Sequence, residues 1–326
     1  MSHVLVERVG RVGYLTLARS AALNALDRDM IDALAHGLEA HVANGEVELL
    51  VIRSREERAF CAGGDMRRAR ELVLTERFDE LDAFFAAEYA LNLAIARCPK
   101  PYVALIDGIA MGGGLGLSVH GSHRVVTERA VLAMPEVKIG FFPDVGASFF
   151  LPRLPGRAGR WLGLTGDSVR AELAVLLGLA THHVKSSALP ALLRRLEHDA
   201  SESVDDVLEK ACAVVALDEP MLEFLRRRGR WFVADTAEAI DETLGEAAPR
   251  SEEAGQLLRT LRAASPHSVR TTLELFEGNE ERSLAEALER EREFACEAVR
   301  HPDFTEGIRA VLVDRRPPRW ERSTGD

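Results

Sequence analysis

Residues 102–119 read YVALIDGIAMGGGLGLSV, and this stretch decides what kind of fold the chain can form. It holds 18 mostly apolar residues, a length that by itself suggests a membrane-spanning helix. Asp107 and five glycines interrupt that pattern and favour a buried strand over Tyr102–Ile106, followed by a glycine-rich turn. Leu115–His120, after the turn, predict the start of a helix. A strand, a turn and a helix in this order are typical of an α/β fold.

The rest of the first half of the sequence alternates strands and helices in the same way. Val4–Arg8 and Val12–Leu17 flank a glycine turn and predict a strand pair. Asp27 is a candidate N-cap, because apolar residues from Met30 onward keep helical spacing. The remaining predicted elements are strands over Leu49–Arg53, Arg124–Thr127 and Val131–Ala133, and a helix over Thr75–Arg97.

From about Ser186 the sequence changes character, with helical spacing and few β-branched residues. Ser283 followed by Glu286 forms a capping box at the start of one of these helices. The sequence therefore predicts two parts, an α/β part over residues 1–185 and a helical part over residues 186–326. The predicted helices are Ser187–His198, Asp205–Leu217, Glu219–Arg228, Ala237–Glu242, Glu252–Ala264, Pro266–Gly278 and Ser283–Val299.

Composition and charge exclude several classes of function. The chain has 326 residues, of which 47% are hydrophobic, so it can bury a sizeable core. Its formal net charge of −11 disfavours nucleic acid, whose phosphates it would repel. Four scattered cysteines give no disulfide framework, and His182-His183 lacks partners at metal-site spacing. Met1–Gly13 contains no apolar run long enough for a signal peptide. We therefore expect a soluble, cytoplasmic protein that binds no metal, nucleic acid or membrane.

Two glycine clusters each follow an apolar strand. Residues 59–65 read AFCAGGD, and residues 111–114 read MGGG. Such glycines let the backbone turn sharply and expose amide N–H groups, to which an anion or a developing oxyanion can bind. Taken singly, either cluster fits a tight, closely packed loop equally well. Together they favour an oxyanion hole that holds a carbonyl oxygen between one N–H of each cluster, with each donor contributing roughly 3–4 kcal/mol.

Three carboxylates lie in apolar surroundings, where burial raises a carboxyl pKa toward the range of a general base. Glu136 follows an apolar strand, and Asp144 lies eight residues later. A surface turn is the alternative for Glu136, and an N-cap before Gly146–Leu151 is the alternative for Asp144. Glu88 keeps the spacing of an apolar helical stripe, which places it either in the core or at the edge, where its carboxylate would reach water.

Longer motifs make the sequence similar to a known family. FCAGGD at residues 60–65, GIAMGGG at 108–114 and MPE at 134–136 resemble the crotonase (enoyl-CoA hydratase/isomerase) superfamily. Asn24-Ala25-Leu26 resembles another signature of that family, with Ser20 in place of its usual proline. Within the superfamily the sequence is most similar to the 3-hydroxyisobutyryl-CoA hydrolase branch. This likeness is carried by GGGLGLSVHG at 112–121, AMPE at 133–136, GFFPDVG at 140–146 and DFTEGIRAVLVD at 303–314.

The resemblance implies a spiral of ββα turns, which holds the oxyanion hole, followed by a helical C-terminal region. It implies acyl-CoA substrates, no metal or redox cofactor, and a homo-oligomer, in this family often a trimer. By position, the catalytic groups are the N–H groups of Gly64 and Gly113 and the carboxylates of Glu136 and Asp144. The residues that match substrate-binding positions are Glu88 at the acyl group, and Ala62, Asp65 and Met66 along the adenine and pantetheine.

One departure from the family separates its reactions. Hydratases carry a second glutamate two residues after the glycine triplet, where this chain has Gly116. The resemblance therefore favours hydrolysis of a short 3-hydroxyacyl-CoA thioester, namely 3-hydroxyisobutyryl-CoA in valine breakdown. One alternative is hydration or double-bond isomerisation of an enoyl-CoA. Another is a non-catalytic acyl-CoA-binding module.

Overall fold

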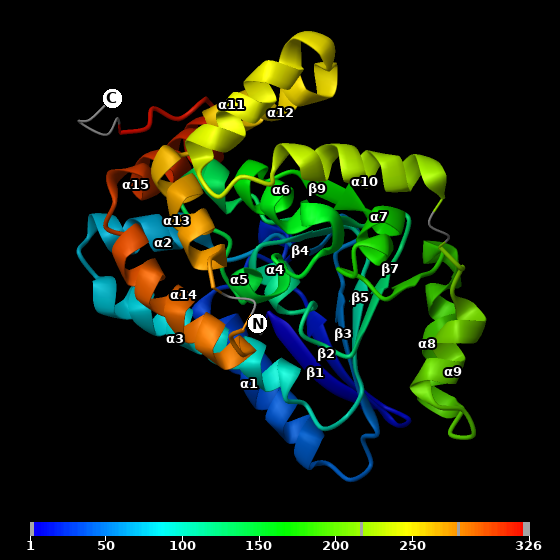
Figure 1. Ribbon diagram of the computed structural model, residues 1–326. Helices are drawn as coiled ribbons and strands as arrows, with labels where there is room; N and C mark the ends of the chain where they lie inside the picture. Colours follow the sequence, from blue (N-terminus) through cyan, green and yellow to red (C-terminus); the bar gives the residue numbers. More distant parts are fainter. Residues whose placement is uncertain (1–2, 216–217, 279–280, 322–326) are drawn as a thin grey trace. The chain divides into compact units, whose positions relative to one another are not determined.

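The computed structural model describes residues 3–215, 218–278 and 281–321 of the chain (Figure 1). The chain forms two compact units, each assembled from separated segments. Unit 1 comprises residues 1–64, 87–133 and 169–216, and unit 2 comprises residues 65–86, 134–168 and 217–326. The units alternate along the chain, and the predicted parts 1–185 and 186–326 each contribute to both.

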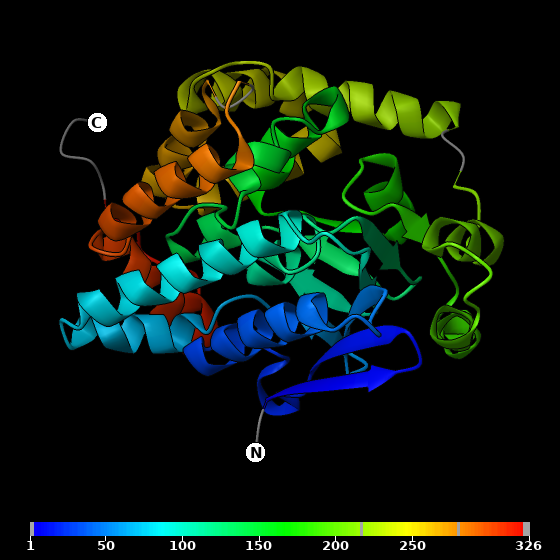
Figure 2. The same cartoon turned by 90° about the horizontal axis from the view of Figure 1, so that it is seen from below.

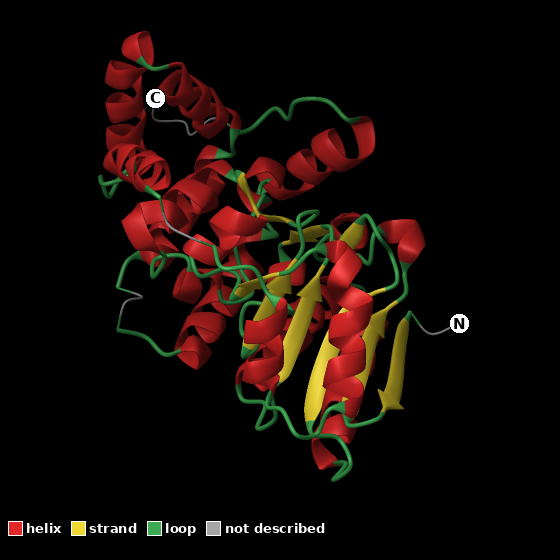
Figure 3. Ribbon diagram, turned by 90° about the vertical axis from the view of Figure 1, so that its right-hand side faces the viewer, coloured by secondary structure: helices red, strands yellow, loops and turns green. Residues whose placement is uncertain are grey.

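Unit 1 is built around a six-stranded sheet with the strand order β1-β2-β3-β5-β7-β10. The first pair is antiparallel and the other strands are parallel, and Figure 3 shows them side by side. Buried Val, Leu and Ile fill the central strands, as parallel strands require. The predicted strand pair and the strands predicted from Leu49 and Tyr102 are confirmed, the strand predicted over Arg124–Thr127 lies one residue earlier, and β10 is not predicted from the sequence. The six are β1 Val4–Val9, β2 Val12–Leu17, β3 Leu49–Ser54, β5 Tyr102–Ile106, β7 His123–Val126 and β10 His182–His183.

A second, smaller sheet has the order β4-β6-β8-β9, and its strands are short. In it β6 pairs in parallel with β4 and with β8. The loops that follow β4 and β6 are the two glycine clusters, so this sheet sets where both clusters begin. The four strands are β4 Ala59–Cys61, β6 Ile109–Met111, β8 Val131–Ala133 and β9 Ser168–Arg170.

Helices pack on the large sheet of unit 1. The predicted N-cap Asp27 is confirmed, since its side chain accepts a hydrogen bond of 2.9 Å from Met30 N and α1 (Arg28–Ala43) starts there. This helix packs against β1 and β2 (Figure 2). The other helices wholly in unit 1 are α4 Gly113–Gly116, α7 Ala171–Leu176, α8 Leu189–His198 and α9 Val204–Ala211.

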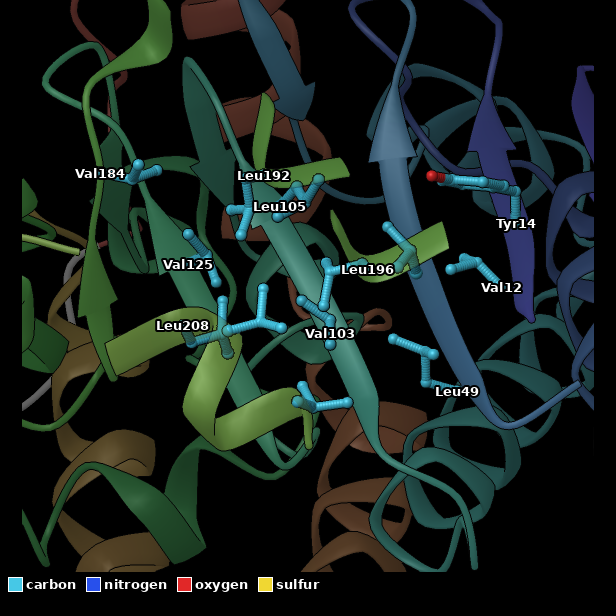
Figure 4. Close-up of a cluster of buried hydrophobic side chains, with 13 residues drawn as sticks. Val12, Tyr14, Leu49, Val103, Leu105, Val125, Val184, Leu192, Leu196 and Leu208 are labelled. Atoms are coloured by element: carbon cyan, nitrogen blue, oxygen red, sulfur yellow. The ribbon is translucent and has the colours of Figure 1, made fainter. Parts of the chain in front are cut away.

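A hydrophobic cluster joins α8 and α9 to the sheet (Figure 4). Leu192 and Leu196 of α8 and Leu208 of α9 are buried against side chains such as Val103 and Val125. Each fully buried side chain of this size contributes about 1.5–3 kcal/mol to folding. The cluster therefore explains why residues 189–211 belong to unit 1, although the predicted helical region begins before them.

Unit 2 is mostly helical. Figure 1 shows α11 and α12 lying against each other, and α14 packs on α5 and α13. The predicted capping box is confirmed at the start of α14, where Ser283 and Glu286 exchange hydrogen bonds. The helices of this unit are α2 Met66–Leu74, α5 Ala147–Phe150, α6 Ala158–Thr165, α10 Glu219–Trp231, α11 Ala237–Ala247, α12 Glu252–Ala263, α13 Pro266–Phe276, α14 Leu284–Ala298 and α15 Pro302–Ile308.

Several predicted helix bounds are wrong for local reasons. The helix predicted over 75–97 is α3 (Phe78–Ala96), because Thr75 ends α2 and Glu76 adopts a positive φ of 56°. The helix predicted to start at Leu115 begins at Gly113. The helix predicted over 205–217 ends at Ala211, and Leu217 lies outside the described residues. Within the described residues, no helix has both the length and the apolar character needed to cross a membrane.

Candidate functional site

Asn24 anchors the loop that carries the first glycine cluster. It is fully buried with a positive φ of 57°, a conformation that asparagine tolerates better than most residues. Its amide nitrogen donates hydrogen bonds to Ser54 Oγ at 2.7 Å and to Phe60 O at 2.9 Å, while its oxygen accepts one from Arg19 N at 2.8 Å. Because Phe60 lies in β4, the Asn-Ala-Leu signature has a structural use, which is to hold the strand that leads into the glycines.

The two glycine clusters of unit 1 lie against each other. Gly63 has a φ of 100° and Gly112 a φ of 49°, so both need the conformational freedom of glycine. A Cβ at Gly63 would lie 3.1 Å from Met111 O and 3.6 Å from Gly113 N. A Cβ at Gly113 would lie 3.5 Å from Gly64 N. The structure thus brings together the two amides that the sequence singles out.

The structure gives neither of these two amides a hydrogen-bond acceptor among the described residues. Gly113 is the first residue of α4, so its N–H has no partner within the helix. Two N–H groups that lie close together without protein acceptors form a binding site for one oxygen atom that carries negative charge. Their role as an oxyanion hole stays a prediction.

Glu88 lies beside this amide pair. Its side chain is only 2% exposed, so the alternative of a carboxylate that reaches water at the helix edge is wrong. A Cβ at Gly113 would collide with Oε1 of Glu88 unless that carboxylate moved, so the Glu88 side chain lies directly against this position. Burial, together with the negative charge of Glu88, raises the pKa of the Cys61 thiol to about 12. Cys61 therefore stays protonated and is no candidate nucleophile.

In unit 2, Glu136 begins a short 3₁₀ turn, Glu136–Ile139, and is 8% exposed. The surface-turn alternative is therefore wrong. Gly140, with a φ of 78°, reverses the chain after the turn, and a Cβ there would collide with Asp303 O. The next residue, Phe141, stacks on Phe142 with ring centroids 4.5 Å apart. Close packing on both sides of Gly140 thus fixes the segment between the two predicted catalytic carboxylates.

Asp144 is also buried, with 6% exposure, and it does not act as an N-cap. The N-cap of α5 is Gly146, which has no side chain that could cap the helix. Between Asp144 and the helix the backbone passes through two left-handed residues, Val145 at φ 54° and Gly146 at φ 85°. Valine in this region is strained because its β-branched side chain crowds the backbone. The segment needs external support.

That support comes from Glu291, a residue that the sequence interpretation missed. Glu291 lies on α14, has no exposed surface, and accepts hydrogen bonds from Gly146 N at 2.7 Å and Ser148 N at 2.8 Å. Ser148 Oγ donates a third, at 2.5 Å. Burial raises the pKa of the Glu291 carboxyl to about 8, and the charge of Asp144 adds to the increase. Glu291 interrupts a buried stripe of Ala287, Leu288 and Ala295, which is the signal that singled out Glu88.

The residues predicted to line the CoA path have ordinary structural contacts. Ala62 N donates to Leu23 O at 3.1 Å. Asp65 is the N-cap of α2 and accepts from Arg68 N at 3.1 Å, and Met66 is the first residue of that helix. All three are half-buried, so each keeps some exposed surface. Their binding roles stay predictions.

A pocket of about 450 Å³ is a different feature of unit 1. Polar side chains such as Thr16, Arg53 and Asp107 line it, and Arg53 stacks on a tyrosine ring. None of the predicted catalytic or substrate-binding residues belongs to its lining. The amide pair is therefore the stronger candidate for chemistry.

Comparison with known proteins identifies the family. The sequence profile of the family described as "Enoyl-CoA hydratase/isomerase" matches residues 12–326. The chain belongs to this family. It is 40% identical to the mitochondrial 3-hydroxyisobutyryl-CoA hydrolase of Bos taurus over 329 aligned positions, which cover 98% of this chain and 84% of that protein. The protein of the same name from Homo sapiens is also 40% identical, with the same coverage.

Solved structures confirm the predicted crotonase fold. A carnitinyl-CoA dehydratase from Mycobacterium thermoresistibile superposes with a TM-score of 0.91 at 34% identity, covering 100% of this chain and 95% of that one. An enoyl-CoA hydratase from Rhodobacter sphaeroides 2.4.1 gives a TM-score of 0.89 at 38% identity, covering 98% and 93%. These family members carry the titles of different reactions, so the fold alone does not assign the chemistry.

The Gly113 amide can be tested by comparing two substitutions. Gly113→Pro removes the N–H, whereas Gly113→Ala keeps it, and both place a Cβ against Glu88. We expect folded G113P to turn over thioester about 10²–10³ times more slowly than G113A, as for the loss of one oxyanion donor. Steady-state rates, with circular dichroism to check folding, measure this. Equal rates in the two folded variants would show that the amide takes no part.

The pKa of Glu291 predicts a pH dependence of stability. The carboxyl titrates at 4.5 ordinarily and at about 8 when folded, so between these values the folded protein holds a proton that the unfolded chain releases. Raising the pH in this window therefore destabilises the fold, by up to about 1.4 kcal/mol per pH unit. We expect the free energy of unfolding of the wild type, minus that of E291Q, to fall from pH 5 to pH 8 in urea titrations. A constant difference contradicts the raised pKa.

Proposed function

We propose that this protein hydrolyses 3-hydroxyisobutyryl-CoA to 3-hydroxyisobutyrate and CoA, a step of valine breakdown. The observation that carries the proposal is the 40% identity over 98% of the chain to relatives named 3-hydroxyisobutyryl-CoA hydrolase. The amide pair and the buried carboxylates support it. Thioester hydrolysis needs donors for an oxyanion and a nucleophile or base, and these residue types supply both.

The first step of the proposed reaction uses the Gly64 and Gly113 amides. A thioester oxygen that accepts both N–H groups draws electron density from its carbon, which becomes easier to attack. In the transition state this oxygen carries negative charge. Donors that are already in place stabilise that charge without a reorganisation cost.

Glu136 is proposed to act at the carbonyl carbon. The Glu136 carboxylate either attacks the carbon, forming a mixed anhydride that water hydrolyses, or takes a proton from the attacking water. In both routes the C–S bond breaks and CoA leaves as the thiol.

Asp144 is proposed to select the substrate. Its carboxylate would accept a hydrogen bond from the 3-hydroxyl of the acyl group, or orient the water. A site built to pair a substrate hydroxyl rejects an analogue that lacks the hydroxyl, by roughly 10⁴-fold in good cases. The low exposure of Asp144 supports this role.

Hydration of an enoyl-CoA is the second candidate, because a solved neighbour at 38% identity is titled an enoyl-CoA hydratase. In the family that reaction uses a second glutamate at the position of Gly116, which has no side chain to offer. Double-bond isomerisation is a variant of this candidate, because isomerases of the family can carry an acidic residue near the position of Asp144. A non-catalytic binding module gains nothing from buried carboxylates whose desolvation costs free energy.

The remaining assignments are part of the same proposal. Glu88 would contact the acyl group, while Ala62, Asp65 and Met66 would line the path of the CoA moiety. CoA belongs to the substrate, and no separate cofactor or metal is proposed. We further propose a homo-oligomer, a trimer by resemblance to the family, and a cytoplasmic location, although the names of the vertebrate relatives place those proteins in mitochondria.

A direct assay separates the two reactions. The purified protein is incubated with 3-hydroxyisobutyryl-CoA and, separately, with crotonyl-CoA. Release of free thiol and loss of the enoyl absorbance are followed. We expect rapid thiol release from the first substrate and little change in the second. Rapid hydration of crotonyl-CoA without thiol release would overturn the assignment in favour of a hydratase.

Isosteric amides separate the roles of the two carboxylates. Glu136→Gln should lower hydrolysis about 10³-fold, as for the loss of a general base. Asp144→Asn should mainly reduce the preference for 3-hydroxyisobutyryl-CoA over isobutyryl-CoA, which lacks the hydroxyl. A single turnover of the wild type in ¹⁸O-labelled water then distinguishes the routes, because only the anhydride route places label in Glu136. An E136Q variant that hydrolyses at the wild-type rate would eliminate both routes.

A further inference from the structure

Glu291 links two segments of unit 2 that are far apart in the sequence. Its carboxylate oxygens accept from Gly146 N and from both the N–H and the hydroxyl of Ser148, over a separation of 143 to 145 residues. All three donors lie within four residues of Asp144. No other part of α14 (Leu284–Ala298) makes hydrogen bonds of this kind to the segment among the described residues.

These hydrogen bonds hold a backbone that local forces disfavour. Val145 and Gly146 are both left-handed, and a β-branched residue there is a genuine outlier. Backbone strain of this kind persists only when surrounding groups impose it, and it is found mostly at functional sites. The ordinary local solution, a Ser, Thr or Asp side chain at the N-cap of α5, is absent because Gly146 occupies that position. Instead, the carboxyl group of Glu291, which lies on α14, accepts hydrogen bonds from the N–H groups of Gly146 and Ser148.

Burying an ionisable side chain to accept these hydrogen bonds costs free energy. Glu291 has no exposed surface, and burial opposes its charged form. The negative charge of Asp144 opposes it further and raises the pKa of Glu291, so the two carboxyl groups interact electrostatically. A purely structural tie between α5 and α14 does not require a carboxyl group beside another carboxylate. Perturbed groups in such settings are candidates for a functional role.

We propose that Glu291 is a positioning residue for Asp144: by fixing Gly146 and Ser148, it sets where the Asp144 carboxylate meets the substrate hydroxyl. This inference rests on the proposed function of Asp144. It predicts that changes at Glu291 alter which substrate is preferred, whereas a role confined to stability lowers the amount of active enzyme for every substrate alike.

The test measures the ratio of kcat/KM for 3-hydroxyisobutyryl-CoA to kcat/KM for isobutyryl-CoA. Glu291→Gln replaces one carboxyl oxygen, which can accept a hydrogen bond even when protonated, by an NH₂ group that cannot accept one, and we expect the ratio to fall about 10- to 100-fold, as for other residues that orient a functional group. Ser148→Ala removes one donor of three, and we expect a fall of about fivefold, as for one hydrogen bond. Glu291→Asp, which keeps the carboxyl group, should lie between the wild type and E291Q.

A double-mutant cycle with D144N shows whether Glu291 acts through Asp144. In the D144N background, E291Q should change the ratio by less than about twofold. Leu288→Ala, a buried residue of the same helix, is the matched control and should reduce stability without changing the ratio. If E291Q does not fold, S148A and E291D carry the test.

The outcomes separate the two proposals. If D144N leaves the ratio unchanged, Asp144 does not recognise the hydroxyl, and the inference about Glu291 falls with that role. If D144N lowers the ratio while E291Q, E291D and S148A keep it at the wild-type value, the positioning role is wrong and the proposed role of Asp144 stands. An E291Q effect that persists undiminished in the D144N background also contradicts the inference.

Discussion

The backbone of the loop after β4 lies close to the backbone before and at the start of α4, so that a Cβ at Gly63 would lie 3.1 Å from Met111 O and 3.6 Å from Gly113 N. Gly63 and Gly113 each lie where a Cβ would meet main-chain atoms or a buried carboxylate of the other elements. This approach depends on the short parallel sheet and on Asn24, which ties the β4 loop to its neighbours. Glycine favours this approach because Gly63 and Gly112 have a positive φ, and among the described residues the same arrangement leaves the N–H groups of Gly64 and Gly113 without protein acceptors.

Unit 2, which is mostly helical, buries two of the candidate catalytic carboxylates at defined positions. Glu136 and Asp144 lie on either side of Gly140, where close packing against Asp303 leaves no room for a side chain. Phe141 adds an aromatic contact with Phe304 on the same helix as Asp303, at 5.6 Å between ring centroids. Buried ionisable groups reduce stability. A protein keeps them where chemistry or recognition needs a carboxylate with a fixed position and little water around it.

Much of this could be predicted from the sequence, because the deciding residues act locally. Glycines at fixed places after apolar strands predict sharp turns with exposed amides, and the structure brings Gly64 and Gly113 together as expected. Spacing alone could not decide between burial and exposure for Glu88, since both keep the same helical period. The sequence likewise allows Asp144 to be either a catalytic carboxylate or an N-cap. The structure resolves each case through contacts with residues distant in the sequence.

The contacts of Glu291 and the make-up of the two units could not be predicted from local sequence patterns. The sequence predicts the helix that carries Glu291, but its partners lie more than 140 residues away and leave no trace in its own spacing. The buried apolar stripe that Glu291 interrupts is the one local sign of its burial. The compact units are likewise built from interleaved segments, because burial against the sheet decides where α8 and α9 belong, not their helical character.

The central claim is that the amides of Gly64 and Gly113 polarise a thioester carbonyl, and infrared spectroscopy of the bound substrate tests it most directly. The slow variant E136Q is loaded with 3-hydroxyisobutyryl-CoA labelled with ¹³C at the thioester carbon. The isotope-edited carbonyl stretch is compared with that of the free thioester in buffer. We predict a lower frequency in the complex, and a return toward the free value when G113P is added to E136Q. A stretch that stays at the free value in the E136Q complex would contradict the account.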